Sequence, residues 1–261
     1  MALPRALDPF VRTPTRAALF CDFDGSLSPI VRDPSAARVL PAARDALARL
    51  VPRLARIAVV SGRPAAFLRD ALALDGVEYV GIYGLERVVG DDVVVDERVA
   101  PFVDAVARAA DEAEAALPGL RVERKGKVAV TIHWREQPDR GDAARAWATE
   151  AGPRLGLEAP LRGRMAMELR PPVPVDKGTT VAALAEGMDV AAFAGDDAGD
   201  VAAFAALRAM ADTGALSHAV TIGVTSDESP PEVRAADALV EGPAGLAALL
   251  DALADAISAR G

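Results

Sequence analysis

The chain has 261 residues, 51% of them hydrophobic, and a formal net charge of −9 at pH 7. This length and hydrophobic content support one large domain, or a core with a smaller insert, and they exclude a disordered chain. The negative charge argues against nonspecific nucleic-acid binding. The sequence has no stretch of about 18 uncharged apolar residues, which argues against a membrane span.

Cys21 is the only cysteine, so a disulfide framework is excluded and a reducing compartment fits. We expect it to be a small buried residue. The N-terminus lacks a basic segment followed by an apolar core and a cleavage site, which argues against secretion. These features favour a cytoplasmic protein with no nucleic-acid or membrane partner. We also expect, independently of these features, a monomer whose partner is a small molecule.

Apolar runs that predict strands alternate with helical patterns along most of the chain. The expected strands lie at residues 17–21, 55–60, 77–82, 190–194 and 219–224. The expected helices lie at about 41–51, 64–74, 178–187, 199–211 and 244–258. This alternation predicts an α/β fold with a doubly wound parallel sheet.

The pattern changes in the middle of the chain, which predicts an inserted smaller α+β module. Its expected elements are helices 102–117 and 140–154 and strands near 120–124, 127–135 and 157–169. We accordingly assign residues 1–101 and 172–261 to a core and residues 102–171 to a cap. Prolines at both junctions are candidate hinges, so the cap could act as a lid that excludes water.

The first candidate site follows the first strand, where Asp22 and Asp24 precede Gly25. In an extended segment both carboxylates point to the same side. An ionised Asp22 could attack phosphorus directly, while Asp24 could protonate the leaving oxygen and later activate water. Gly25 allows a sharp turn whose backbone N–H groups can face a phosphate oxygen.

Two other interpretations of this segment deserve comparison with a catalytic role. The pentapeptide that starts at Asp22 could be only a turn, because Asp, Gly and Ser favour turns. A calcium-binding EF-hand loop is excluded, since Leu27 stands at the sixth position, where that loop needs glycine.

A second acidic cluster, Asp196, Asp197 and Asp200, follows the strand expected at residues 190–194. The carboxyl ends of parallel strands meet at one edge of a sheet, so we expect both clusters at one point. Crowded carboxylates need a cation, and oxygen ligands without His or Cys favour Mg²⁺ over zinc. The alternative is that these acids merely stabilise a helix N-terminus.

Ser61, Arg63 and Lys177 complete a candidate phosphate site. Ser61 follows another predicted strand and can donate to a phosphate oxygen, or it can cap the next helix. Lys177 stands at the start of a predicted helix, where a cation is disfavoured unless an anion lies nearby. We therefore expect Lys177 to bind the phosphate and Asp22.

The order of these motifs resembles that of the haloacid dehalogenase superfamily of phosphatases. The motifs are Asp22-x-Asp24-Gly-Ser, Ser61-Gly-Arg63, Lys177-Gly178 and Gly195-Asp-Asp-x-x-Asp200. Within that superfamily, about residues 15–250 resemble the trehalose-phosphatase family. The further segments behind this resemblance are Asp24-Gly-Ser-Leu-Ser-Pro-Ile30, Tyr83-Gly-Leu-Glu86, His133-Trp-Arg135, Glu168-Leu-Arg-Pro171 and Asp176-Lys-Gly178.

The resemblance implies an Mg²⁺-dependent hydrolysis of trehalose 6-phosphate through an aspartyl-phosphate. It implies that Asp22 is the nucleophile, Asp24 the acid and base, and Ser61 and Lys177 the phosphate ligands. The implied metal ligands are an Asp22 carboxylate oxygen, the Asp24 backbone carbonyl and Asp196, while Asp197 and Asp200 orient metal-bound water. Gly25 and Arg63 are expected to contact the substrate.

The sugar is expected to be recognised by polar side chains of the cap. The candidates, some of which could instead be solvated surface, are Glu123, Lys125, His133, Arg135 and Glu168. Glu123 and Lys125 are two residues apart, as are His133 and Arg135, so each pair can share a strand face.

One departure from the family pattern is visible, and other functions stay open. Gly199 and Val201 flank Asp200, where the family commonly has Thr and Glu. The alternatives are a phosphatase for sucrose phosphate or mannosylglycerate phosphate, a phosphomutase of the same superfamily, and a catalytically inactive sugar-phosphate sensor.

Overall fold

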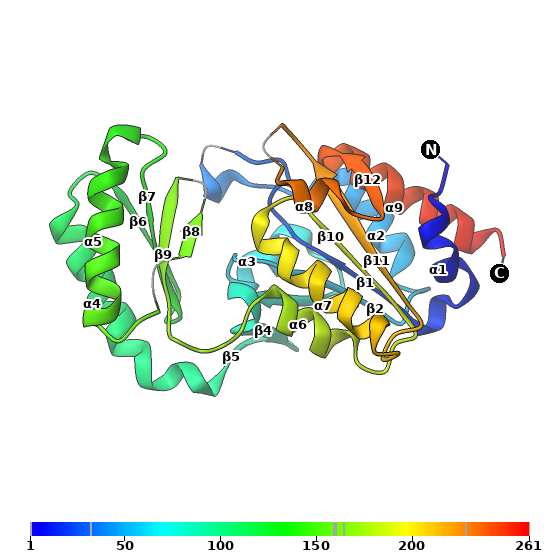
Figure 1. The fold of residues 1–261 in the computed structure, drawn as a ribbon, viewed down its shortest axis with the longest axis horizontal. Helices are drawn as coiled ribbons and strands as arrows, with labels where there is room; N and C mark the ends of the chain where they lie inside the picture. Colours follow the sequence, from blue (N-terminus) through cyan, green and yellow to red (C-terminus); the bar gives the residue numbers. More distant parts are fainter. Residues whose placement is uncertain (1, 32, 159–160, 164, 228, 261) are drawn as a thin grey trace. The chain divides into compact units, whose positions relative to one another are not determined.

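The structure, a computed structural model, describes residues 2–31, 33–158, 161–163, 165–227 and 229–260. The chain forms two compact units (Figure 1). The core unit consists of Met1–Asp92 and Val175–Gly261, and the insert unit consists of Val93–Pro174. The insert unit thus also contains residues 93–101 and 172–174, on either side of the range assigned to the cap from the sequence.

An eight-stranded sheet has the order β12-β11-β10-β1-β2-β3-β4-β5. Its strands are β1 Ala17–Cys21, β2 Arg56–Val60, β3 Glu78–Gly81, β4 Glu86–Val89, β5 Asp92–Val95, β10 Val190–Gly195, β11 His218–Thr225 and β12 Ala238–Glu241. The six strands from β12 to β3 run parallel, and β4 pairs antiparallel with β3. This arrangement confirms the predicted doubly wound α/β fold.

Helices cover both faces of this sheet because its central strands are apolar on both sides. In β1, Leu19 and Cys21 pack into one cluster, and Phe20 packs into the cluster on the opposite face. Helices α1 Asp8–Arg12, α2 Pro41–Leu50, α3 Ala65–Leu72 and α9 Gly242–Ser258 contribute to the first cluster. Helices α6 Lys177–Ala185, α7 Val201–Asp212 and α8 Pro231–Arg234 contribute to the second.

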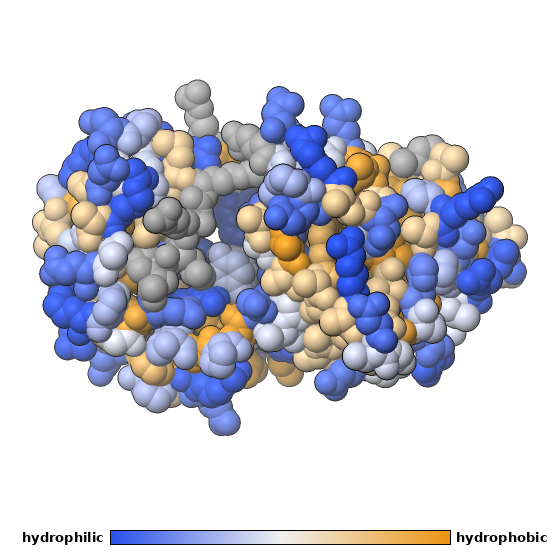
Figure 2. Space-filling model, in the orientation of Figure 1, coloured by the Kyte–Doolittle hydropathy of each residue, from blue (hydrophilic) through white to orange (hydrophobic). Residues whose placement is uncertain are grey.

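Short 3-10 segments connect several of these elements. They lie at Arg5–Leu7, Pro14–Arg16, Pro34–Ala36, Ile82–Gly84 and Ala198–Asp200 in the core unit, and at Glu97–Phe102 and Pro138–Arg140 in the insert unit. Polar residues are spread over both units on the face drawn in Figure 2. No described helix is long and apolar enough to cross a membrane.

The insert unit contains an antiparallel sheet of order β6-β7-β9-β8. Its elements are α4 Val103–Ala116, β6 Arg121–Lys125, β7 Ala129–His133, α5 Gly141–Arg154, β8 Leu161–Gly163 and β9 Ala166–Leu169. Residues 159, 160 and 164, which fall in the last strand region expected from the sequence, lie outside the described residues. Val130 and Leu169 pack with residues of α4 and α5, which leaves the alternate positions of β7 and β9 on the other face.

Candidate active site

Three of the expected site residues lie at the carboxyl ends of adjacent parallel strands. Asp22 follows β1, Ser61 follows β2, and Asp196 follows β10. The pairing of β1 with both neighbours places these strand ends side by side, and the Asp22 N–H donates to the Ala194 carbonyl oxygen at 2.9 Å. The chain order changes direction at β1, where open α/β sheets bind their ligands.

Asp22, Asp196 and Asp200 form a buried carboxylate cluster, with one oxygen of each lying within 4.8 Å of the others. Their exposed fractions are 4%, 3% and 0%. Gly25, with φ of +81°, lies against this cluster, since a Cβ there would be 2.2 Å from Asp196 Oδ2. Three hard oxygen donors brought together in this way fit a divalent cation such as Mg²⁺.

Lys177 is the cation of this cluster. Its Nζ lies 2.8 Å from Asp22 Oδ1 and 2.6 Å from Asp200 Oδ1. Asp176 and Thr179 form a capping box that starts α6 at Lys177 and thereby fixes the base of this side chain. With all groups ionised, the three carboxylates of the cluster and this one ammonium leave two negative charges for a metal to balance, and Asp22 and Asp200 contact the ammonium directly.

Burial and charge shift the protonation of these groups. Burial raises the pKa of Asp22 well above its ordinary value; Lys177 opposes this shift, and Asp200 and Asp196 add to it. Burial lowers the pKa of Lys177, but the Asp200 and Asp22 carboxylates outweigh it and leave that pKa well above its ordinary value. Lys177 is therefore charged at neutral pH.

Asp200 and Asp197 organise the loop that carries Asp196. Asp200 Oδ2 accepts hydrogen bonds from the N–H groups of Asp196 at 2.8 Å and of Asp197 at 3.1 Å. Asp197 Oδ1 accepts from the Gly199 N–H at 2.8 Å. The helix-capping interpretation therefore applies to Asp197 and Asp200, which cap Ala198–Asp200, while Asp200 also contacts Lys177.

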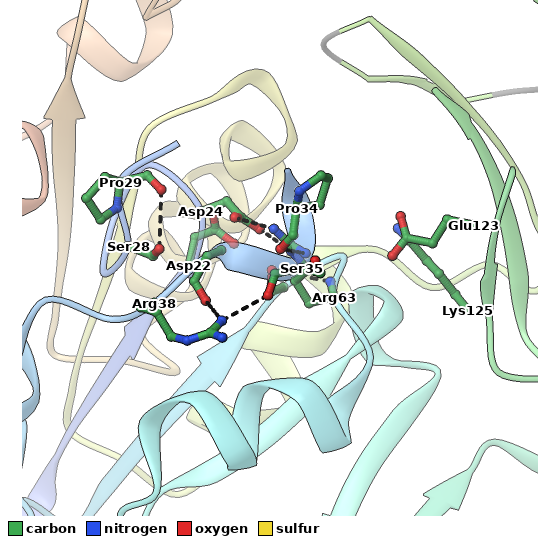
Figure 3. A network of polar contacts seen from close by, with 12 residues as sticks. Asp22, Asp24, Ser28, Pro29, Pro34, Ser35, Arg38, Arg63, Glu123 and Lys125 are labelled. Atoms are coloured by element: carbon green, nitrogen blue, oxygen red, sulfur yellow. Dashed lines mark hydrogen bonds and ion pairs between the residues drawn. The ribbon is translucent and has the colours of Figure 1, made fainter. Parts of the chain in front are cut away.

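Arg63 binds Asp24 in a bidentate ion pair, with Nε 2.6 Å from Oδ2 and NH2 2.8 Å from Oδ1 (Figure 3). The guanidinium also donates to the Pro34 carbonyl oxygen at 2.8 Å and lies 4.8 Å from the centre of the Phe67 ring. Sequence reasoning expected Arg63 to contact the substrate and gave no indication of this pair. The two residues are far apart in sequence and have no shared pattern.

Ser61 is 3% exposed, and its Oγ accepts from the Arg63 N–H at 3.4 Å. It does not cap the next helix, because Pro64 is the N-cap of α3 and the Ala65 N–H donates to Glu86 Oε2 at 2.9 Å. This contact gives Glu86 a structural role that sequence reasoning missed.

The amide of Gly25 is already hydrogen-bonded, since it donates to the Ser28 carbonyl oxygen at 2.8 Å. The expectation that backbone N–H groups of this turn face a phosphate oxygen stays a prediction. Gly25 permits the close approach of the backbone to Asp196, which no residue with a Cβ would allow.

All but one of the sugar-binding candidates of the insert unit lie on the same face of its sheet. The group shares the sheet face opposite α4 and α5, and Figure 3 shows Glu123 and Lys125 extending from the same side of β6. We call it the polar face; it comprises Glu123, Lys125, Thr131, His133 and Glu168. Arg135 is the outlier, because β7 ends at His133 and the exposed Arg135 lies in the following turn.

Hydrogen bonds join the polar face across its strands. Lys125 Nζ and Thr131 Oγ1 both donate to Glu168 Oε2, the latter at 3.0 Å. His133 Nε2 lies 2.7 Å from Glu123 Oε2. Among the described residues, the buried Glu168 Oε1 has no hydrogen-bond partner. Sequence reasoning missed Thr131, although the register aligns it with both Glu123 and Glu168.

Comparison with solved structures identifies the fold. A crystal structure of a trehalose-6-phosphate phosphatase related protein matches with a TM-score of 0.77 and 25% identity, covering 94% of this chain and 100% of that one. The C-terminal domain of Candida albicans trehalose-6-phosphate phosphatase gives 0.72 and 24%, covering 97% and 98%. A haloacid dehalogenase-like hydrolase from Bacteroides thetaiotaomicron gives 0.58 and 17%, covering 94% and 99%.

Comparison of sequences identifies the family. The trehalose-phosphate phosphatase of Mycobacterium marinum is 32% identical over 275 residues, which cover 99% of this chain and 68% of that protein. The Mycobacterium tuberculosis protein of the same name is 33% identical over 249 residues, covering 91% and 61%. The chain thus spans 61% to 68% of the length of these relatives. The family model described as trehalose-phosphatase matches residues 20–239, and the chain belongs to this family.

Proposed function

We propose that the chain hydrolyses trehalose 6-phosphate to trehalose and phosphate. The observation that supports this most strongly is the cluster of Asp22, Asp196 and Asp200, in which Lys177 contacts Asp22 and Asp200, in a chain of the trehalose-phosphatase family. The members of this family are phosphoric monoester hydrolases. A cytoplasmic location and a monomeric state stay predictions from the sequence.

In the first step an oxygen of Asp22 attacks phosphorus, and the bond from phosphorus to the sugar oxygen breaks. Asp24 gives a proton to that leaving oxygen. In the second step Asp24 takes a proton from water, the water oxygen attacks phosphorus, and the bond to Asp22 breaks to release phosphate. Both Asp24 oxygens bind Arg63 here, so the acid role requires this pair to open when substrate binds.

Ser61 and Lys177 are the proposed ligands of the transferred phosphoryl group. Lys177 is charged and buried, so it stabilises the negative charge that Asp22 and the phosphoryl group share. Mg²⁺ would be held by an Asp22 oxygen, the Asp24 carbonyl oxygen and Asp196, with Asp197 and Asp200 orienting its water. When bound, this ion would neutralise the phosphoryl oxygens.

The polar face of the insert unit, together with Arg135, is the proposed sugar-binding surface. Its hydrogen bonds fix Lys125 and Glu168 in place before any ligand arrives. Glu168 Oε1 accepts no hydrogen bond from a described residue, so a sugar hydroxyl could donate to it.

A phosphate-release assay on a panel of sugar phosphates tests this proposal. We expect turnover to be fastest with trehalose 6-phosphate, to stop with EDTA and to return with added Mg²⁺. Faster turnover of sucrose phosphate or mannosylglycerate phosphate would assign another substrate. Binding of trehalose 6-phosphate without any phosphate release would favour the sensor alternative.

A further inference from the structure

The turn Ile82–Gly84 has an unusual backbone conformation. The φ angles are +45° at Ile82, +60° at Tyr83 and +123° at Gly84. A positive φ is rare outside glycine, and it is an outlier for a β-branched residue such as isoleucine. Such conformations persist only where the surrounding structure imposes them, and they concentrate near functional sites. Tyr83 and Gly84 of this turn begin the Tyr83-Gly-Leu-Glu86 motif, to which the proposed function assigns no role.

One side of this turn holds the segment that carries Ser61. The Tyr83 N–H donates to the Ser61 carbonyl oxygen, and the Ile82 N–H donates to the Arg63 carbonyl oxygen, each at 3.0 Å. The Tyr83 ring packs against Gly62, where a Cβ would lie 2.6 Å from the phenol oxygen. Two backbone hydrogen bonds and one ring therefore fix the position of Ser61.

The other side of the turn holds the helix that carries Lys177. Thr180 Oγ1 donates to the Tyr83 carbonyl oxygen at 2.8 Å, and Thr180 follows Lys177 by one helical turn in α6. Gly84 packs so closely that a Cβ there would lie 2.1 Å from Thr180 Oγ1 and 2.7 Å from a Val175 methyl group. The Thr180 side chain is 4% exposed, so water does not readily replace its hydrogen bond.

We infer that the Ile82–Gly84 turn sets the spacing between Ser61 and Lys177, and that Tyr83 and Thr180 are positioning residues for phosphoryl transfer. The path runs from Thr180 Oγ1 through the Tyr83 peptide to the Ser61 carbonyl group. This inference rests on the proposed function, in which Ser61 and Lys177 bind the phosphoryl group. Positioning matters here because phosphoryl transfer depends on geometry and electrostatics.

The substitution Thr180→Val tests this role, because it removes the hydroxyl and keeps the branched shape. We expect kcat/KM to fall about tenfold, equally with trehalose 6-phosphate and p-nitrophenyl phosphate, since both present the same phosphoryl group. Thr180→Ser keeps the donor and should restore most of the activity. Thr213→Val is the matched control: it removes a hydroxyl that also donates to backbone carbonyls, at the end of α7, and should leave kcat/KM unchanged.

A double-mutant cycle separates positioning of Ser61 from general support of the fold. On a Ser61→Ala background we expect Thr180→Val to change kcat/KM by less than about twofold, because the group it positions is already absent. The full tenfold loss on that background would overturn the inference, as would wild-type activity of Thr180→Val. If Thr180→Val does not fold, Thr180→Ala applies the same test without added bulk. A wild-type protein that releases no phosphate would overturn the proposed function, and this inference with it.

Discussion

The core site and the polar face of the insert unit are both rich in charged side chains, but their charges are balanced differently. In the core, three buried carboxylates are grouped with one ammonium, that of Lys177, which contacts two of them, and the excess negative charge favours a bound cation. On the polar face each carboxylate has a nitrogen partner, since Glu168 binds Lys125 and Glu123 binds His133. An excess of charge suits a metal and a phosphoryl group, whereas paired groups suit neutral hydroxyls.

The largest expected effect is the loss of the nucleophile in the core site. Asp22→Asn should lower kcat by more than about a thousandfold, roughly 4 kcal/mol in the barrier, because an amide is a poor nucleophile and metal ligand. Circular dichroism should show an intact fold, and the exposed Asp212→Asn serves as control. Near-native turnover in a sample free of deamidation would rule out Asp22 as nucleophile.

The three acids after β10 should separate into distinct roles. Asp196→Ala should raise the Mg²⁺ concentration for half-maximal activity by at least about tenfold, and more than Asp197→Ala or Asp200→Ala do. Asp200→Ala should instead lower the unfolding free energy most, by roughly 3 kcal/mol, since it removes one of the two carboxylates that contact Lys177 and leaves two N–H groups without their acceptor. Magnesium titrations and urea unfolding measure both quantities. Equal effects of all three substitutions on the magnesium requirement would refute this assignment.

Substitutions on the polar face should slow the turnover of trehalose 6-phosphate and leave that of a small phosphate ester almost unchanged. Lys125→Ala and Glu168→Ala should each weaken turnover of trehalose 6-phosphate by about 1 to 3 kcal/mol, with little change for p-nitrophenyl phosphate. Arg124→Ala is the matched control on the same strand, because Arg124 pairs with Asp111 and Glu114 of α4. An equal loss of turnover with both substrates would mean that Lys125 and Glu168 maintain the fold and do not bind the sugar.

The smallest expected effect is a pH dependence of stability in the metal-free protein. The pKa of Asp22 is raised by burial, so the folded protein holds this proton in a range where the unfolded chain has released it. The unfolding free energy therefore falls as the pH rises from the pKa of Asp22 in the unfolded chain toward its higher pKa in the folded protein. Because Mg²⁺ would bind the ionised carboxylate, the rise in Tm on adding Mg²⁺ should grow as the pH rises above the ordinary carboxyl pKa. The same increment at every pH, or an unchanged trend in Asp22→Asn, would contradict this.

The strands and helices of the core, and the site residues at their ends, could be predicted from the sequence because apolar periodicity determines them. The central strands are apolar on both faces, so the positions of Asp22, Ser61 and Asp196 followed from the rule that parallel strands end at one edge. The contact of Lys177 with Asp22 followed from its place at a helix start. Strands β4, β5 and β12 were not predicted, although valines on either side of Gly90 were a signal for the first two.

The contacts that sequence reasoning missed depend on side chains meeting across the fold. Arg63 binds Asp24, and Glu86 accepts from the first amide of α3, although no local pattern links either pair. Thr131 joined the polar face only through strand register, which hydrophobic alternation does not fix residue by residue. The positive φ angles of Ile82 and Tyr83 are equally invisible, because isoleucine and tyrosine do not favour such a turn.

Acid quenching during turnover of trehalose 6-phosphate labelled at phosphorus tests the central claim most directly. Peptide mapping of the quenched protein should find the label on the peptide that contains Asp22, and Asp22→Asn should carry none. Label on another residue, or steady turnover without any labelled protein, would contradict an aspartyl-phosphate at Asp22.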